Sequence, residues 1–360
     1  MESKFKTWMS KKKIPGAAAC IAAGNDIVWN RGFGLANIRE KVPFSADQSL
    51  FQIASITKTI TATATMQLRD CGHFEIDDDI NEYLQFPIRN PHHPDEPITF
   101  QHLLMHTSSL KDSGFFHPPY TIGDPSVGLK DIVTQIFYPN TNLLGPAGFY
   151  KSVPGKIKRY SNAGFALLGY LIEAISGKSL ESYLQQKIFE PLEMMETSFY
   201  IERLDSRRLV RPYTYANRSL KKLCPGDGDG NLLPHGKKPV VGYNEHALYS
   251  YPTLADGMLR TSVNQLAHFM IAMMNYGQFR GNQLLKPQTI AEMIPKSSDG
   301  LCWLKIGNYW GHDGRDPGCS TELMFDAGNK IGFIIFANAD VGLKKGSRLI
   351  RKKAEAQTGS

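Results

Sequence analysis

The sequence predicts a mixed α/β (α+β) fold in which one sheet is built from both ends of the chain and a mainly helical region is inserted between them. Short apolar runs separated by glycine or asparagine turns occur in residues 17–35 and again in residues 301–338, as expected of strands. Segments with helical periodicity and helix stop signals lie between them. We therefore expect a sheet domain from residues 1–75 and 240–360, and an inserted helical domain from residues 76–239.

The first elements are a helix and a hairpin. A polar helix is expected over residues 2–13, because Pro15 and Gly16 then interrupt it. Two short apolar runs follow and are joined at Gly24 and Asn25, which predicts a β-hairpin.

The later elements follow from the same periodicities and from the glycines and prolines that end each run. Helices are expected at residues 98–104, 129–137, 163–176, 180–188, 261–276 and 343–356, and strands at residues 301–306, 309–312, 320–325 and 331–338. The segment from Pro118 to Pro154 is rich in Pro, Gly, Asn and aromatic residues. A long loop of this kind in a compact domain is typical of a functional or mobile segment.

Composition and charge exclude several classes of function. The chain has 360 residues, of which 42% are hydrophobic and 21% charged, as in ordinary globular proteins. No apolar run approaches the roughly 20 residues that span a bilayer. The first residues lack the apolar core of a signal peptide, so we expect a cytoplasmic protein, or an exported one if a leader was trimmed away. The net charge of +7 includes small clusters at residues 11–13 and 344–353, which solvated terminal helices explain better than a nucleic-acid groove.

No metal or cofactor is indicated. The five cysteines are widely spaced, with no CxxC pair among them. A turn-rich segment beginning at Asp227 mimics the opening of a calcium loop, but Leu232 stands where that loop requires glycine. His102 and His106 have the i, i+4 spacing of a zinc pair, but Leu103 replaces the glutamate of H-E-x-x-H. We interpret both histidines as structural.

The candidate chemistry starts at Ser55 and Lys58. If this stretch is helical, the two side chains share one face, because a helix turns by about 100° per residue. Free N–H groups and the positive end of the dipole would favour negative charge at Ser55, and Lys58 could take its proton if burial lowers the lysine pKa. Ser-x-x-Lys alone is a weak signal, and the alternating threonines of residues 56–66 favour a strand. The stop signal at residues 70–72 supports the helix.

Two distant segments hold candidate partners for this pair. Tyr160 and Asn162 precede a predicted helix, where the tyrosine could relay a proton and the amide could hold Lys58 or a substrate carbonyl. Taken alone, Tyr-x-Asn is more simply an ordinary helix start. His312 and Gly314 lie in a predicted strand, and glycine in a strand often marks close approach of a ligand. Taken alone, a strand histidine is more often a packed or surface residue.

In the order Ser-x-x-Lys, Tyr-x-Asn and His-x-Gly, these motifs make the chain similar to the serine β-lactamase and penicillin-binding protein family. Within it the chain resembles the branch of class C β-lactamases, D-alanyl-D-alanine carboxypeptidases, D-aminopeptidases and related esterases. The likeness runs nearly end to end, through residues 14–16, 32–36, 51–59, 102–110, 154–155, 160–162, 191–194, 301–303 and 311–318. It implies the β-lactamase/transpeptidase-like fold, with an antiparallel sheet flanked by helices.

The resemblance also implies a role for each candidate residue. Ser55 would attack a carbonyl and form an acyl-enzyme, with Lys58 and Tyr160 as general base and acid. The backbone N–H groups of Ser55 and Arg315 would form the oxyanion hole. Asn162 would orient the substrate or the lysine. No metal or cofactor is implied.

The chain departs from the family pattern around the third motif. His312 stands where true lactamases carry the lysine of Lys-Thr-Gly, and Asp313 stands before Gly314 where relatives usually place Thr or Ser. A carboxylate there would repel one on the substrate, unless Arg315, two residues along the same strand face, neutralises it. This predicts a neutral ester or amide substrate, or one bearing a free amine.

Three positions that are commonly glycine in relatives are not glycine here: Ser109, Glu193 and Asp256. At the first two we expect only altered turns.

The function favoured by the sequence is a serine hydrolase of esterase, amidase or aminopeptidase type, acting on a small-molecule or peptide-like substrate. The alternatives are a D-alanyl-D-alanine carboxypeptidase or class C-like β-lactamase, and a catalytically idle relative that binds a peptide in the cleft. An α/β-hydrolase is disfavoured because no G-x-S-x-G motif occurs in the sequence. The sequence does not specify an oligomeric state.

Overall fold

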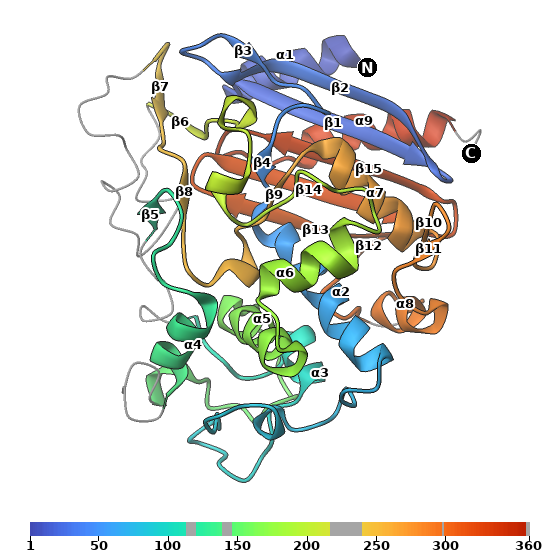
Figure 1. Ribbon diagram of the computed structural model, residues 1–360. Coiled ribbons are helices and arrows are strands. Elements are labelled where there is room, and N and C mark those ends of the chain that lie inside the picture. The colour runs from blue at the N-terminus through green and yellow to red at the C-terminus, as the bar shows by residue number, and fades with distance from the viewer. Residues whose placement is uncertain (113–119, 139–145, 217–239, 297–298, 358–360) are drawn as a thin grey trace.

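The centre of the molecule is a seven-stranded sheet with strand order β12-β13-β14-β15-β1-β2-β3 (Figure 1). The computed structural model describes residues 1–112, 120–138, 146–216, 240–296 and 299–357. The strands of the sheet are β1 (Gly16–Ala23), β2 (Asp26–Asn37), β3 (Val42–Pro43), β12 (Leu304–Ile306), β13 (Tyr309–Asp316), β14 (Cys319–Asp326) and β15 (Ile331–Ala337). β1 pairs antiparallel with β15, with Ala19 opposite Ile335. The antiparallel sheet built from both termini is thereby confirmed.

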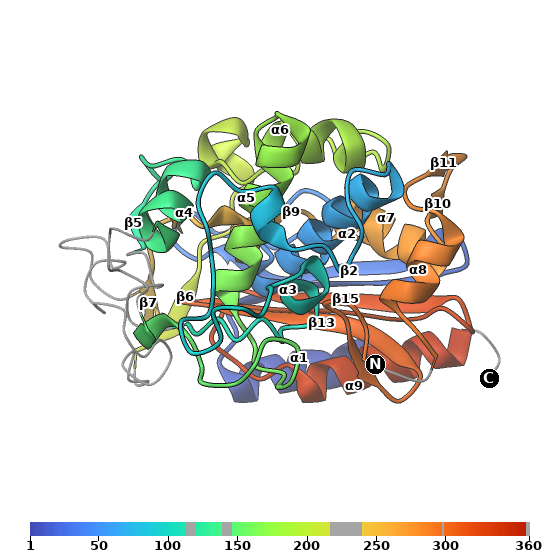
Figure 2. The ribbon, with the colours of Figure 1, turned by 90° about the horizontal axis from the view of Figure 1, so that it is seen from below.

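Two helices from opposite ends of the chain cover one face of this sheet. α1 (Glu2–Lys12) and α9 (Lys344–Gln357) lie together beneath the strands, and the sheet separates them from the other helices (Figure 2). Ala17, Ala19 and Ile21 of β1 belong to the core on this side, and the residues between them belong to the core on the other side. Side chains of a strand alternate between its two faces. Because both faces of β1 are covered, both sets of side chains are apolar, which explains the continuous apolar run in the sequence.

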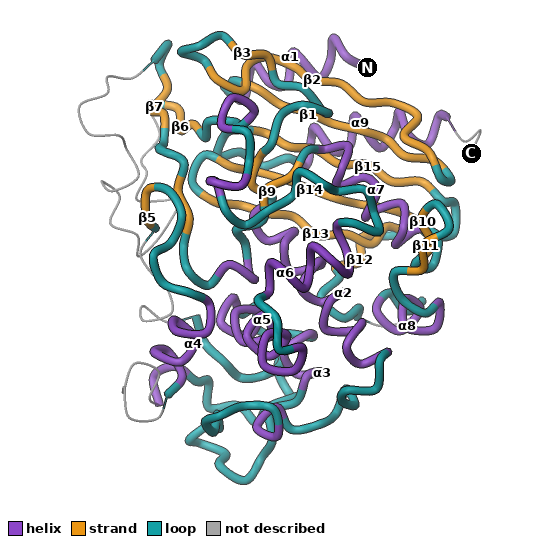
Figure 3. Tube along the Cα trace, in the orientation of Figure 1, coloured by secondary structure: helices purple, strands orange, loops and turns teal. Residues whose placement is uncertain are grey.

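The opposite face carries the larger core. α7 (Val263–Met274) packs on the strands, and α2 (Thr57–Asp70) packs against α5 (Asn162–Ser176) beyond it. Figure 3 shows the long strands gathered in the upper half and α2 to α6 in the lower half. The other helices are α3 (Phe100–Leu104), α4 (Leu129–Phe137), α6 (Leu180–Leu184) and α8 (Pro287–Met293).

α2 is a helix in spite of its strand-like composition. Its residues from Thr57 to Met66 are all buried. The hydroxyl of Thr63 donates to the carbonyl of Thr59 (2.8 Å), and the hydroxyl of Thr65 donates to the carbonyl of Thr61 (2.9 Å). Threonine hydroxyls that bond one turn back need no other partner, so the sequence can place them in the core. The helical prediction is confirmed.

The structure adds elements that the sequence analysis did not predict. One of them is α8, which begins with a proline in its first turn. The helix expected over residues 180–188 is present as α6, which residues 185–189 continue as one turn of π-helix. Short strands form two-stranded pairs: β4 (Phe51–Gln52) with β9 (Arg260–Thr261), β5 (Thr121–Ile122) with β8 (Tyr249–Ser250), β6 (Tyr213–Tyr215) with β7 (Tyr243–Glu245), and β10 (Gln278–Phe279) with β11 (Asn282–Gln283). The rejected calcium loop lies outside the described residues, and the division into two domains stays a prediction.

Within the described ranges, no helix combines the length and the apolar character needed to cross a membrane.

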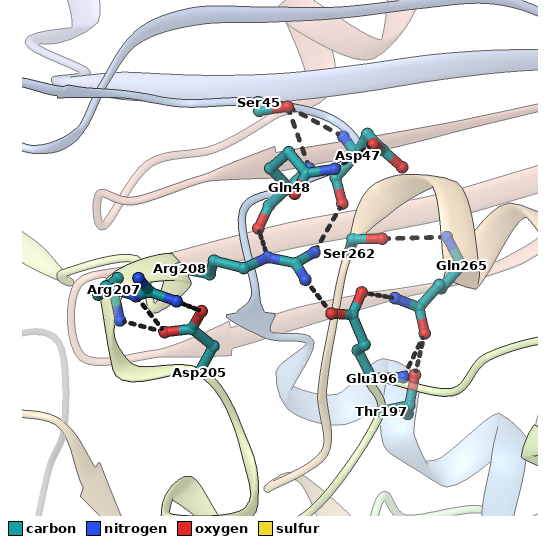
Figure 4. Close-up of polar contacts among 10 residues, drawn as sticks. All are labelled: Ser45, Asp47, Gln48, Glu196, Thr197, Asp205, Arg207, Arg208, Ser262 and Gln265. Carbon is teal, nitrogen blue, oxygen red and sulfur yellow. Dashed lines mark hydrogen bonds and ion pairs between the residues drawn. The ribbon is translucent and has the colours of Figure 1, made fainter.

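A polar network fastens residues 196–208 to the sheet side of the molecule (Figure 4). The guanidinium of Arg208 donates to the carbonyl of Gln48 (2.6 Å) and pairs with Glu196. The Gln265 amide of α7 donates to the same glutamate (3.3 Å). The loop before β4 and the start of α7 are therefore held together at one end of the β4–β9 pair.

Candidate active site

Ser55 is presented at the surface by an unusual turn. It follows β4 in a 3₁₀ turn (Ala54–Ile56) that runs directly into α2. Ala54 has φ of +47°, a conformation that costs energy for a residue with a Cβ and that persists where the surroundings enforce it. Among residues 51–60, Ser55 alone is not buried. Its hydroxyl is therefore accessible while its backbone is fixed.

Lys58 lies directly beneath this hydroxyl. It is fully buried, and its Nζ donates to Ser55 Oγ (3.2 Å) and to the carbonyl of Asp256 (2.5 Å). Burial, the largest influence, lowers the pKa of Lys58, but the opposing charges of Tyr160, Asp256 and Asp112 outweigh it and raise that pKa. Lys58 therefore does not have the lowered pKa that a lysine needs in order to act as a neutral base.

Tyr160 completes the group. Its ring stacks on His106 (centroids 4.5 Å apart), and the Lys58 ammonium lies 4.9 Å from its centroid. The residue as a whole is 46% exposed, yet burial of its hydroxyl raises its pKa, while the charge of Lys58 and hydrogen bonding to Lys58 and Ser55 oppose that rise. The structure thus brings together the serine, the lysine and the tyrosine that the motifs indicated.

The segment carrying Tyr160 is held by Asp112, which the sequence did not indicate, and by His106, which was interpreted as structural. Asp112 caps α5 from outside the helix, accepting the N–H groups of Asn162 (2.8 Å) and Ala163 (3.0 Å). The N–H of Ser161 donates to Nδ1 of His106 (3.2 Å), whose ring supports Tyr160. Ser161 could be predicted as a helix N-cap, whereas Asp112 and His106 lie in the irregular segment after α3, which has no pattern to place them.

Asn162 does not hold the lysine. The Lys58 ammonium bonds to Ser55 and Asp256, while the hydrogen bond of Asn162 to Asp112 uses its backbone. Its role toward a substrate stays a prediction.

His312 is buried and neutral rather than a positive substitute for lysine. Its Nδ1 lies 2.6 Å from the carbonyl of Asp313 and donates to it, and burial lowers its pKa to about 4. Its Nε2 has no hydrogen-bond partner among the described residues. The rings of His312 and Tyr160 are 6.3 Å apart, so the imidazole belongs to the site but carries no charge at neutral pH.

Gly314 is required for β13 to approach the nucleophile turn. A Cβ at Gly314 would lie 2.4 Å from the carbonyl oxygen of Ile53 and 3.0 Å from the Cβ of Ala54. The glycine predicted to mark a close approach therefore receives the backbone that leads into Ser55. This packing brings the backbone of the next residue, Arg315, to the nucleophile turn.

Asp313 lies on the wrong face to meet a substrate at Ser55. Strand alternation turns Asp313 and Arg315 away from His312; their side chains are 53% and 67% exposed and form an ion pair at 3.7 Å. Asp313 is opposite Glu322 of β14, whose carboxylate accepts the hydroxyl of Ser347 in α9. Arg315 pairs with Asp313, and this pairing is the condition under which no repulsion of a substrate carboxylate is expected.

The two non-glycine positions expected to form altered turns have left-handed backbones. Ser109 has φ of +64° and Glu193 has φ of +55°. His102, read as structural, accepts the N–H of Thr99 at Nδ1 and so completes the capping box of α3.

Together, the fold and the grouping of Ser55, Lys58 and Tyr160 are those of a β-lactamase-like protein. The chain belongs to the β-lactamase family, because the sequence model of that family, described as "Beta-lactamase", matches residues 1–358.

Three comparisons illustrate the relationship. Penicillin-binding protein 4* of Bacillus subtilis (strain 168) is 32% identical over 210 residues, which cover 58% of this chain and 43% of that protein. The octameric penicillin-binding protein homologue from Pyrococcus abyssi superposes with a TM-score of 0.72 at 23% identity, covering 94% of this chain and 73% of the other. The D-amino acid amidase from Ochrobactrum anthropi SV3 complexed with L-phenylalanine superposes with a TM-score of 0.75 at 20% identity, covering 95% and 93%.

These structural matches establish the fold. The chain spans less than half the length of the curated relatives it matches in sequence.

Proposed function

We propose that the protein cleaves an ester or amide bond of a small-molecule or peptide-like substrate through an acyl-enzyme on Ser55. The observation that carries this proposal is the 3.2 Å contact from Lys58 Nζ to Ser55 Oγ. The position of Tyr160 supports it, because the Lys58 ammonium lies 4.9 Å from the centroid of the tyrosine ring. A serine bonded to one proton-handling group, with a second beside that group, is an arrangement suited to nucleophilic catalysis.

The protonation states of Lys58 and Tyr160 define the first step of the reaction. The pKa values of Lys58 and Tyr160 are both raised, so the resting site holds an ammonium ion and a phenol. One of these protons must leave before the pair can accept the proton of Ser55. Ser55 Oγ then bonds to the substrate carbonyl carbon, and its proton passes to Lys58 or Tyr160.

The second half of the reaction returns that proton. As the bond from the carbonyl carbon to the leaving oxygen or nitrogen breaks, the pair protonates the leaving atom. Water then attacks the acyl carbon and gives a proton to the pair. The bond from that carbon to Ser55 Oγ breaks, the pair returns the proton to Oγ, and the acyl group leaves as the acid. The N–H groups of Ser55 and Arg315 would stabilise the oxyanion in both halves, by about 3–4 kcal/mol for each donor.

A neutral substrate fits the site better than one with a carboxylate. His312 occupies the position where lactamases carry a lysine, and burial keeps its imidazole uncharged. A neutral ring offers a carboxylate less attraction than an ammonium ion does. This supports an esterase or amidase over the alternatives, a D-alanyl-D-alanine carboxypeptidase or a class C-like β-lactamase.

Labelling with a fluorophosphonate tests the nucleophile. We expect the wild-type protein to gain one adduct, located by mass spectrometry on the peptide containing Ser55, and Ser55→Ala to gain none. Equal circular dichroism and Tm of the two proteins would control for folding. A folded wild-type protein that resists labelling at every pH would contradict the proposal and favour a catalytically idle, peptide-binding relative.

A substrate panel tests the class of bond. p-Nitrophenyl esters and D- and L-amino acid amides would be compared with a chromogenic cephalosporin and a D-alanyl-D-alanine peptide. We expect kcat/KM for the best neutral ester or amide to exceed that for the two carboxylate-bearing substrates by at least about 100-fold, roughly 3 kcal/mol. The reverse order would assign the protein to the penicillin-binding or lactamase alternatives.

A further inference from the structure

A buried carboxylate lies beside the proposed catalytic lysine. Asp256 ends the short 3₁₀ turn η9 (Leu254–Asp256) and is 4% exposed. Its carbonyl accepts Lys58 Nζ at 2.5 Å, so its Cα is fixed next to the ammonium ion. Its Oδ2 accepts the hydroxyl of Tyr251 (3.1 Å). The lysine thus bonds to the backbone of Asp256, and the charge of the Asp256 side chain favours its ammonium form.

The position of η9 is fixed by the helix that carries Lys58. The hydroxyl of Thr61 in α2 donates to the carbonyl of Ala255 (2.7 Å), one residue before Asp256. On the other side, the ring of Tyr120 lies 5.3 Å from that of Tyr251, and its hydroxyl donates to Asp316 (2.7 Å). The turn η9 is therefore anchored to α2, and the Asp256 carboxylate is bonded to Tyr251, which packs against Tyr120.

We propose that Asp256 is a positioning residue whose carboxylate holds Lys58 as an ammonium ion and thereby sets the pH at which the Lys58–Tyr160 pair becomes able to activate Ser55. This inference rests on the proposed function, in which Ser55 is the nucleophile. The other titratable groups that interact with Lys58 or Asp256 are Asp112, Tyr160, Tyr251, His106, His312 and Cys302.

The charges explain the direction of the effect. Burial raises the pKa of Asp256 to about 6, and the ammonium of Lys58 opposes that rise. Above pH 6 the aspartate is therefore ionised, and its charge favours the protonated lysine. Without that charge, the penalty for burying an ammonium ion is less well offset, so the pair should lose its proton at a lower pH.

Asp256→Asn tests this because it removes the charge and keeps the backbone carbonyl that binds Lys58. The measurement is the pseudo-first-order rate of fluorophosphonate labelling of Ser55 from pH 5 to pH 10, which needs no known substrate. We expect the rate to rise with pH in the wild type, and the midpoint of that rise to move down by at least one pH unit in Asp256→Asn. The two curves should converge below about pH 6, where Asp256 itself becomes protonated.

Glu181→Gln is a matched control. Glu181 is also a buried carboxylate, 5% exposed, with a pKa raised by burial, but it accepts the hydroxyl of Ser198 (2.6 Å) and lies 3.7 Å from Arg203 rather than next to Lys58. Its midpoint should equal that of the wild type. Asp256→Ser serves as a second uncharged variant if Asp256→Asn does not fold.

The two proposals fail in different ways. A labelled Asp256 variant with the wild-type midpoint would overturn the role of Asp256 and leave Ser55 as the nucleophile. A wild-type protein that is not labelled at any pH would overturn the nucleophile itself.

Discussion

The ring and the hydroxyl of Tyr160 can be tested separately, because phenylalanine lacks only the hydroxyl. Its ring packs on His106 and faces the Lys58 ammonium, and its hydroxyl interacts with Ser55 and Lys58. Tyr160→Phe keeps the ring contacts and removes the hydroxyl. We expect the rate of fluorophosphonate labelling to fall by about 10²–10⁴, the range for loss of a general acid or base, with Tm close to that of the wild type. An undiminished rate would show that Lys58 alone handles the proton.

Some residues of the site could be predicted from the sequence, and others could not. Ser55, Lys58 and Tyr160 were predictable because each belongs to a short motif with fixed spacing. Asp112 and Asp256 were not predicted as neighbours of Lys58, because they come from irregular segments with no periodicity to place them. Asp313 does not share the face of the sheet on which His312 lies, because adjacent side chains in a strand point to opposite sides. Consecutive residues of a strand motif therefore cannot all face the same site.

At the scale of elements, the site depends on how closely β13 packs against the turn before α2. Gly314→Ala would place a Cβ 2.4 Å from the carbonyl of Ile53. We expect β13 to move away from the turn, the labelling rate of Ser55 to fall at least tenfold, and the unfolding free energy to fall by about 1–3 kcal/mol, as for other overpacked positions. Labelling kinetics and urea denaturation would measure both effects.

Gly342→Ala is the control for this substitution. Gly342 also lies near the C-terminal strands, but an added Cβ there meets no atom within 4 Å. Its labelling rate and stability should stay close to wild type. If Gly314→Ala behaves like Gly342→Ala, the close approach of β13 is not needed for the reactivity of Ser55.

Elements were predictable where local signals and burial agree. The run over residues 129–137 has one apolar face and forms α4 with those bounds. The prediction for α2 was ambiguous, because its alternating threonines are typical of a strand and only the hydroxyl bonds to preceding carbonyls explain their burial in a helix. The short strand pairs such as β4 with β9 have no sequence signal of their own, since two-residue strands form only where tertiary contacts bring them together.

At the scale of the whole molecule, the arrangement of sheet and helices places several titratable groups in the core. Sequence patterns predicted which segments are buried, because the apolar runs at both ends of the chain leave water by packing against one another. They did not predict which histidines would be buried without charge. His246 is one: it follows β7, is 2% exposed, and its Nε2 lies 2.7 Å from the hydroxyl of Thr214.

The pH dependence of stability follows from this burial. Burial lowers the pKa of His246 to about 4, whereas an unfolded histidine titrates near 6.5. Between these values the unfolded chain binds the proton and the folded protein does not, so stability is fully present above about pH 6.5 and is lost as pH falls towards 4. For His246 alone the loss between pH 7.5 and pH 5 is about 2 kcal/mol.

His246→Gln isolates this contribution. Glutamine can still bond to Thr214 but does not titrate, while the other buried histidines, His106 and His312, remain in both proteins and cancel in the comparison. We expect the variant to be less stable than the wild type at pH 7.5, and the difference in unfolding free energy, from urea denaturation, to shift by about 2 kcal/mol in favour of the variant at pH 5. Parallel curves of unfolding free energy against pH for the two proteins would show that His246 takes up its proton equally in the folded and unfolded states. In that case the burial of a neutral imidazole beside β6 and β7 would not account for the acid sensitivity of the fold.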